Sequence, residues 1–262
     1  MGIKVFKTNL IEKEFEVQAL GFLPERIESF ELKSIAIFAH GYTSHKGSLL
    51  TWASRLVEEG MPVMIFDLPG HYLGGFSEVS NFQSFKESAH ALFYRAYLNL
   101  FLACSVHDDY KIPNVILGGH SMGALLALKA LELDGFSSLN TRAVCVGLGL
   151  LAEGKKHLFA SNFYKSTLNL RSQLVSPELE PDKLFPWIRE EKKNLKLVNK
   201  KVHFITGIDD IVVGKGGTLR IGEILIEQGN QVTYDMPEKL PHHFPEQASS
   251  FIKKYLKKEN LF

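Results

Sequence analysis

The chain has 262 residues, 45% of them hydrophobic, and its 30 basic and 29 acidic residues leave a formal charge of +1. This length is enough for one large domain with a substantial core. The balanced charge gives no electrostatic reason to expect nucleic acid or an anionic membrane as a partner. The N-terminal segment has no apolar run of signal-peptide length, and no stretch approaches the roughly 18 apolar residues of a membrane span. We therefore expect a cytoplasmic protein with no membrane span and no nucleic-acid partner.

Strand-like apolar runs alternate with helix-like periodic stretches along the chain. The runs cover residues 15–22, 34–40, 62–67, 114–119, 143–150, 201–207 and 231–236. Several are apolar almost throughout, which is typical of strands buried on both faces. The alternation predicts an α/β fold, with a mostly parallel, twisted central sheet and helices on both faces.

Three helices are expected from apolar periodicity. Positions 82 to 104 trace one stripe of a long helix with a period near 3.6, and residues 124–133 are apolar nearly all round. A final helix begins near Pro245, where proline suits a first helical position, and its lysine run is expected to be a solvated face. The two cysteines, Cys104 and Cys145, show neither metal-ligand spacing nor a disulfide framework, so we expect reduced core thiols.

The segment 152–200 breaks this alternation. Three prolines divide it and no strand pattern is evident. It is too long for a connecting loop and too short for an independent domain. We interpret it as a small helical lid inserted into a core made of residues 1–151 and 201–262.

The stretch "VILGGHSMGALLALKA", residues 115–130, carries the strongest chemical signal. A buried strand leads into GHSMG and a buried helix follows at once, so Ser121 lies at the apex of a sharp turn. Side chains at Gly119 and Gly123 would collide with neighbouring elements in such a turn. This arrangement would present the Ser121 hydroxyl at a helix N-terminus, which favours developing negative charge. The pattern predicts a serine nucleophile.

A serine nucleophile needs a base, and the base needs an orienting acid. Both residue types follow in order: Asp209 and Asp210 come just after an apolar strand, and His242 and His243 lie between the last strand and the last helix. These positions are carboxyl ends of strands, where sites in open α/β sheets gather.

The chain resembles the α/β-hydrolase superfamily over nearly its whole length, and most closely its small-lid serine esterases and monoacylglycerol-lipase-like or thioesterase-like members. The segments that carry the resemblance are "AHGYTSHKG", "DLPGH", "GGHSMGA", "TGIDD" and "HHFPE". The resemblance implies that Ser121 is the nucleophile, and that the backbone N–H groups of Tyr42 and Met122 form the oxyanion hole. By the superfamily's spacing it selects Asp210 as the acid and His243 as the base.

Two departures from the superfamily pattern concern loops beside the site. Tyr72 replaces the second glycine of a DxPGxG segment, and His242 replaces the glycine common before the catalytic histidine. Six residues are expected to line the substrate pocket: Tyr42, His120, Tyr72, Phe159, Phe163 and Trp187. The ten histidines show no metal-binding pattern, so we expect neither a metal nor another cofactor.

A serine at the elbow indicates acyl transfer through a covalent acyl-enzyme. The first hypothesis is a carboxylic ester hydrolase acting on a small-molecule ester. An acyl thioesterase of the same fold is an alternative within the same chemistry. A catalytically silent hydrolase-like protein that binds a ligand or partner is an alternative from another class. The sequence does not specify an oligomeric state.

Overall fold

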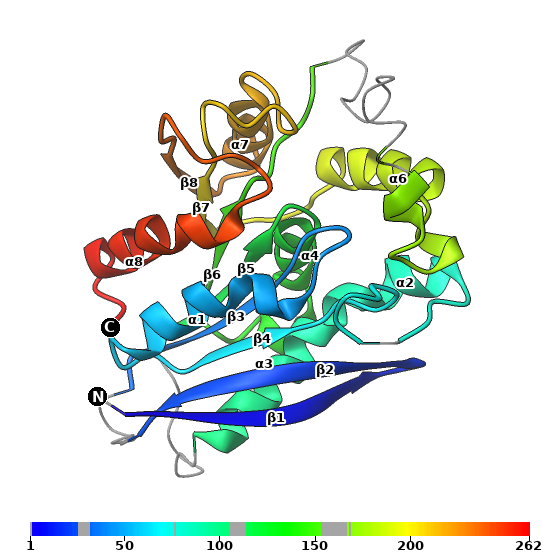
Figure 1. Ribbon diagram of the computed structural model, residues 1–262. Helices are drawn as coiled ribbons and strands as arrows, with labels where there is room; N and C mark the ends of the chain where they lie inside the picture. Colours follow the sequence, from blue (N-terminus) through cyan, green and yellow to red (C-terminus); the bar gives the residue numbers. More distant parts are fainter. Residues whose placement is uncertain (1, 26–31, 76, 105–113, 153–166, 168) are drawn as a thin grey trace.

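A single mixed sheet forms the centre of the protein. The computed structural model describes residues 2–25, 32–75, 77–104, 114–152, 167 and 169–262 (Figure 1). Within these residues eight strands pair in the order β1-β2-β4-β3-β5-β6-β7-β8. Their bounds are β1 Ile3–Glu12, β2 Phe15–Pro24, β3 Ser34–Ala39, β4 Val63–Phe66, β5 Asn114–His120, β6 Thr141–Val146, β7 Lys201–Ile205 and β8 Gln231–Asp235. The pairs β1–β2 and β2–β4 are antiparallel, and all other pairs are parallel. The mostly parallel sheet predicted from sequence is therefore confirmed.

The central strands are buried on both faces, and successive side chains supply two separate cores. In β3, Ile35 and Ile37 belong to one core, whereas Ala36 and Phe38 belong to the other. This alternation follows from the two-residue period of a strand. Helices α3, α4 and α7 cover the first face, and α1 and α8 cover the second.

The helices connect the strands on both sides of the sheet. Their bounds are η2 Lys46–Leu49, α1 Leu50–Val57, α2 Phe82–Ser88, η3 Ala89–Ala91, α3 Leu92–Ala103, α4 Met122–Ala130, η4 Asp134–Phe136, η6 Pro177–Leu179, α6 Pro181–Lys193, α7 Gly217–Glu227, η7 Pro245–Ala248 and α8 Ser249–Lys258. None of the helices in the described residues has the length and apolar character that a membrane crossing requires.

Two elements differ from the sequence prediction. The single long helix expected over residues 82–104 is divided by η3, although Ala89 keeps the apolar stripe continuous between Phe85 and Leu92. Strand β1 was not predicted, because as an edge strand paired only with β2 it exposes most of its side chains. Leu10 is its fully buried residue.

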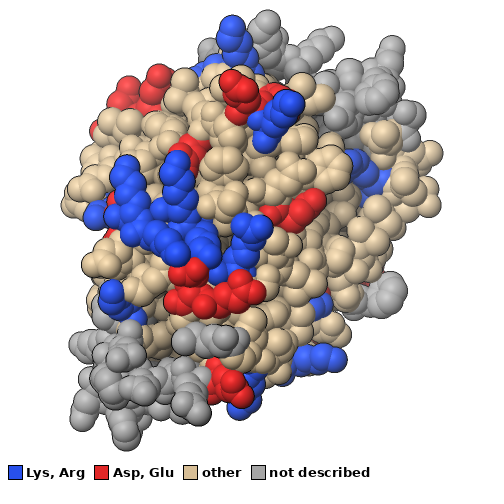
Figure 2. All heavy atoms as spheres, turned by 60° about the vertical axis from the view of Figure 1, so that its left-hand side comes forward, with Lys and Arg blue, Asp and Glu red and all other residues tan. Residues whose placement is uncertain are grey.

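Helix α8 confirms the expected solvated lysine face. Its apolar residues are buried in the second core, whereas Lys257 is exposed and contacts Glu59, just after α1, at 2.8 Å. Figure 2, which brings this side of the molecule forward, shows basic side chains gathered beside acidic ones. Cys104 and Cys145 are buried free thiols, and burial raises the pKa of Cys104 to about 12.

Candidate active site

Ser121 lies at a strained turn between β5 and α4. Its backbone has φ +51° and ψ −109°, in a region that residues other than glycine rarely adopt. The turn passes so close to β3 that a Cβ at position 119 would lie 2.3 Å from the Ala39 carbonyl oxygen, and a Cβ at 123 only 2.1 Å. Glycine at both places makes the turn sterically possible.

The Ser121 side chain faces an open cavity. Its backbone N–H donates to the Val146 carbonyl at 2.8 Å, which ties the turn to the neighbouring strand β6. Among the residues that the structure describes, the hydroxyl makes no hydrogen bond. It is therefore free to react with a molecule in the cavity, at the N-terminus of α4.

Asp210 follows β7 and is buried, with 5% of its surface exposed. One carboxylate oxygen, Oδ1, accepts hydrogen bonds from the backbone N–H groups of Val212 and Val213 at 3.0 and 2.9 Å. The other, Oδ2, lies 2.8 Å from Nδ1 of His242. Since a carboxylate only accepts, Nδ1 of His242 carries the proton of this bond and Nε2 is left as the basic nitrogen.

The histidine bonded to Asp210 is therefore His242, whereas the sequence resemblance selected His243. A hydrogen bond two residues before His242 helps to set this register. Asp209 Oδ1 accepts the backbone N–H of Leu240 at 2.9 Å and so fixes the start of the histidine loop. His243 is exposed, with its ring 5.7 Å from the His242 ring and nearly perpendicular to it. Asp209, the sequence neighbour of Asp210, thus positions the loop that carries both histidines.

His120, the residue before Ser121, packs against His242 with ring centroids 4.7 Å apart. Room for both rings comes from Gly147, where a Cβ would lie 3.2 Å from His120 Nε2 and from His242 Nδ1. Burial holds the pKa of His120 well below its usual range, so the ring is neutral. His242 therefore has a neutral neighbour.

The turn after β3 places Tyr42 beside the elbow. Neither the Tyr42 N–H nor the Met122 N–H donates a hydrogen bond within the described part of the chain. Thr43 has φ +57°, and its hydroxyl donates to the Tyr42 carbonyl at 2.7 Å. Arg171 Nη1 donates to the same hydroxyl at 2.9 Å. The Tyr42 hydroxyl donates to the Leu179 carbonyl at 3.1 Å, so two bonds connect this turn to residues 171–179.

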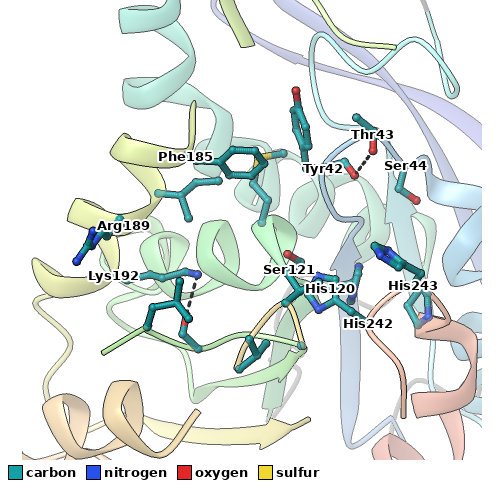
Figure 3. A pocket seen from close by; sticks show the side chains of 18 of the residues that line it. Tyr42, Thr43, Ser44, His120, Ser121, Phe185, Arg189, Lys192, His242 and His243 are labelled. Atoms are coloured by element: carbon teal, nitrogen blue, oxygen red, sulfur yellow. Dashed lines mark hydrogen bonds between the residues drawn. The ribbon is translucent and has the colours of Figure 1, made fainter. Parts of the chain in front are cut away.

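These groups border a cavity of about 660 Å³ (Figure 3). Ser121, His120, His242 and His243 all belong to its wall, and Figure 3 shows them in the same part of the cavity. Apolar side chains form much of the remainder: Met122, Leu150, Leu151, Phe185, Pro186, Ile188, Val212 and Val213. The cavity suits a partly apolar small molecule.

Only some of the expected pocket residues line the cavity. Tyr42 and His120 line the cavity, whereas Tyr72 and Trp187 do not. Trp187 is buried and packs on Phe82 and Phe85 of α2, because it lies on the core-facing side of α6. Tyr72 instead approaches Ser176 with its hydroxyl at 3.4 Å. The remaining two expected residues, Phe159 and Phe163, lie outside the described residues.

Sequence reasoning did not identify Lys192 or Arg171 as cavity residues, although both line it. Lys192 is part of a charge run, "REEKK", and nothing in that run marks which lysine faces inward. A helical projection from the buried Leu184 and Ile188 would have indicated it, because position 192 continues the same face.

The loop histidines His40 and His71 are structural. His40 Nε2 accepts the backbone N–H of Leu68 at 2.9 Å, and His71 Nδ1 bonds the Pro69 carbonyl at 2.9 Å. Both are fully buried. Within the described ranges, no three His, Cys, Asp or Glu side chains come together as a metal site.

A strained serine beside a buried Asp–His pair, at the carboxyl edge of a mostly parallel sheet, defines a serine hydrolase of the α/β-hydrolase fold. Comparison with protein families agrees with this class. Residues 31–239 match the family described as "Serine aminopeptidase, S33", and the chain belongs to that family. Comparison with curated proteins gives no match.

Solved structures support the fold. A carboxyl esterase from Bacillus coagulans is 14% identical with a TM-score of 0.65, covering 98% of this chain and 99% of that one. An esterase from Pyrococcus furiosus is 18% identical with a TM-score of 0.61, over 98% and 90%. An epoxide hydrolase from Vigna radiata is 15% identical with a TM-score of 0.61, over 97% and 98%. An acylaminoacyl peptidase from Pyrococcus horikoshii is also similar, but this chain spans only 41% of its length.

Proposed function

We propose that the protein hydrolyses carboxylic esters through a covalent acyl-enzyme, with Ser121 as nucleophile, His242 as base and Asp210 as orienting acid. The observation that carries this proposal is the 2.8 Å bond between His242 Nδ1 and Asp210 Oδ2, on the wall of the cavity that holds Ser121. It fixes the tautomer in which His242 Nε2 can accept the Ser121 proton.

In the proposed reaction, His242 takes the Ser121 proton as the oxygen attacks the ester carbonyl. The resulting oxyanion accepts hydrogen bonds from the Tyr42 and Met122 N–H groups, each worth about 3 kcal/mol toward the tetrahedral intermediate. His242 then protonates the leaving alcohol. A water molecule, deprotonated by His242, releases the acid and restores Ser121.

Two features support an ester as the substrate. The elbow residue is serine, which suits acyl transfer, and the apolar cavity wall suits an acyl chain. The similar structures include two esterases by name, and also a peptidase and an epoxide hydrolase. Thioester hydrolysis by the same residues remains the alternative prediction, which a substrate panel distinguishes.

The helical lid over residues 152–200 belongs to the same proposal. Of its described residues, α6 supplies Phe185, Ile188 and Lys192 to the cavity wall, and Arg171 reaches the turn after β3. In this proposal the described part of the segment shapes the specificity of the site.

The test combines a fluorophosphonate probe with ester and thioester panels of graded chain length. We expect labelling of the native protein, its loss in Ser121→Ala, and a fall in kcat of about 10⁴- to 10⁶-fold in that variant. Ser54→Ala is the matched control, since its hydroxyl donates to the Thr51 carbonyl of its own helix. An unreactive native protein would favour the catalytically silent alternative, and retained turnover in Ser121→Ala would refute the assignment of the nucleophile.

A further inference from the structure

Lys192 places an ammonium group on the wall of the cavity. Its Nζ donates to the Gly149 carbonyl at 2.8 Å, and Figure 3 shows the side chain extending from α6 into the cavity rather than outward. Among the residues described, no carboxylate lies within ion-pair distance of it. By contrast, the partly buried Lys129 pairs with Glu191, and the exposed Lys183 pairs with Glu178.

The surroundings of Lys192 make this unpaired charge costly. Apolar residues line the same cavity, among them Leu150, Ile188 and Val213. Burial lowers the pKa of Lys192 to about 8, with the Asp210 carboxylate opposing the shift, so the amine is still mostly protonated at neutral pH. An ammonium has three N–H donors, and one carbonyl satisfies only one of them.

The acidic groups nearby are already engaged or directed elsewhere. Asp210 uses both oxygens, toward His242 and two backbone N–H groups. Glu190 lines the cavity but is exposed and lies 3.4 Å from Lys193. Glu246 lines the cavity from η7, on the histidine side. A ligand is therefore the group best placed to supply the missing negative charge.

We propose that Lys192 determines specificity for esters that carry a carboxylate remote from the scissile bond. The carboxylate would accept hydrogen bonds from the N–H groups of Lys192 that have no partner among the described residues, while the chain between it and the ester packs on the apolar wall. Charge-assisted hydrogen bonds of this kind are stronger than neutral ones, particularly out of water. This inference rests on the proposed esterase function and names its substrate class.

A purely structural role for Lys192 makes a different prediction. The bond to Gly149 ties α6 to the turn after β6, so losing it could disturb the cavity for every substrate alike. Only a specificity role changes the ratio of activity between a charged ester and its neutral counterpart.

The experiment compares matched ester pairs. One pair is mono(4-nitrophenyl) adipate and its methyl ester, with the charge on the acyl side; the other is 6-(butyryloxy)hexanoate and its methyl ester, with the charge on the alcohol side. Shorter and longer chains extend each series. In at least one pair we expect the native protein to prefer the charged ester by about 10- to 100-fold in kcat/KM. Lys192→Met should abolish this preference by raising KM for the charged ester, while hydrolysis of the neutral ester is retained. Lys192→Arg should keep much of the preference.

The matched control is Lys193→Met, which removes the same charge from the next, exposed position of α6 and should leave the preference unchanged. Equal activity on charged and neutral esters throughout the series, or a preference that survives in Lys192→Met, would overturn the inference while leaving the esterase proposal intact. Hydrolysis of no ester by the native protein would instead contradict the proposed function. Calorimetric binding of adipate to the native protein and to Lys192→Met then tests the anion site alone: binding lost in the variant supports the site, and no native binding overturns it.

Discussion

At the scale of single residues, the adjacent histidines provide a direct test of the site. His242 bonds Asp210 and packs against His120, whereas His243 is exposed. We expect His242→Ala to lower kcat by about 10³-fold or more, because the general base is lost. His243→Ala, a matched change one position away, should lower it less than 10-fold. Steady-state hydrolysis of a neutral ester measures both, and the reverse order would restore the sequence prediction of His243.

The residue scale also shows how far sequence reasoning reaches. Ser121 could be predicted because the strand, the glycines and the helix that create its turn are contiguous in the chain. The choice between His242 and His243 could not, since it depends on Asp209 holding the Leu240 N–H across 31 positions of sequence. Lys192, by contrast, could have been predicted, because it continues the helical face of the buried Leu184 and Ile188.

At the scale of elements, the turn after β3 and residues 171–179 form one unit. Arg171 holds the Thr43 hydroxyl, which in turn holds the Tyr42 carbonyl, and Thr43 keeps a left-handed backbone that a β-branched residue disfavours. These bonds hold the Tyr42–Thr43 peptide, which directly follows the peptide that carries the Tyr42 N–H. Thr43 thus acts as a positioning residue.

Substituting Thr43 tests this role. Thr43→Val keeps the β-branched shape but removes the hydroxyl, so we expect kcat to fall about 10-fold with little change in KM. Thr43→Ser restores the hydroxyl and should return kcat close to the native value. Steady-state kinetics on a neutral ester separates kcat from KM. If Thr43→Ser is impaired as strongly as Thr43→Val, the hydroxyl does not position the turn.

At the same scale, the strands buried on both faces were easier to predict than β1 or the interruption at η3. Continuous apolar runs identify buried strands, but β1 draws its stability from pairing along one edge with β2. The side chains of β1 therefore give little sign that it is a strand. The interruption at Ala89 leaves the apolar stripe intact, and periodicity alone therefore cannot reveal it.

At the scale of the whole molecule, the parallel strands bring the site together. Tyr42 follows β3, Ser121 follows β5, Asp210 follows β7 and His242 follows β8, so all four lie at the carboxyl edge of one sheet. Residues separated by 200 positions thereby meet without any local sequence signal linking them. The order of these residues could be predicted from sequence, whereas their contacts required the fold.

The same fold buries several histidines in the neutral state, which makes stability depend on pH. Burial lowers the pKa of His71, His90 and His203 to about 4, and holds that of His40 and His120 well below the ordinary value. The unfolded chain takes up protons below about pH 6.5, whereas in the folded protein His71, His90 and His203 do so only near pH 4, and His40 and His120 only well below their ordinary pKa. The free energy of unfolding should therefore be highest above pH 6.5 and fall as the pH decreases toward 4.

Urea unfolding at pH 7, 6 and 5 measures this dependence. Each histidine kept neutral contributes a slope of up to about 1.4 kcal/mol per pH unit, so several together should lower the unfolding midpoint clearly between pH 6 and 5. His203 lies away from the cavity, stacked on Tyr255 at 3.8 Å, and His203→Asn should reduce the slope by about 1 kcal/mol per pH unit, whatever its effect on stability at pH 7. If these histidines are neutral in the folded protein, only the unfolded chain takes up their protons, and stability must fall with pH. A free energy of unfolding that stays constant from pH 7 to 5 would therefore contradict the buried neutral histidines.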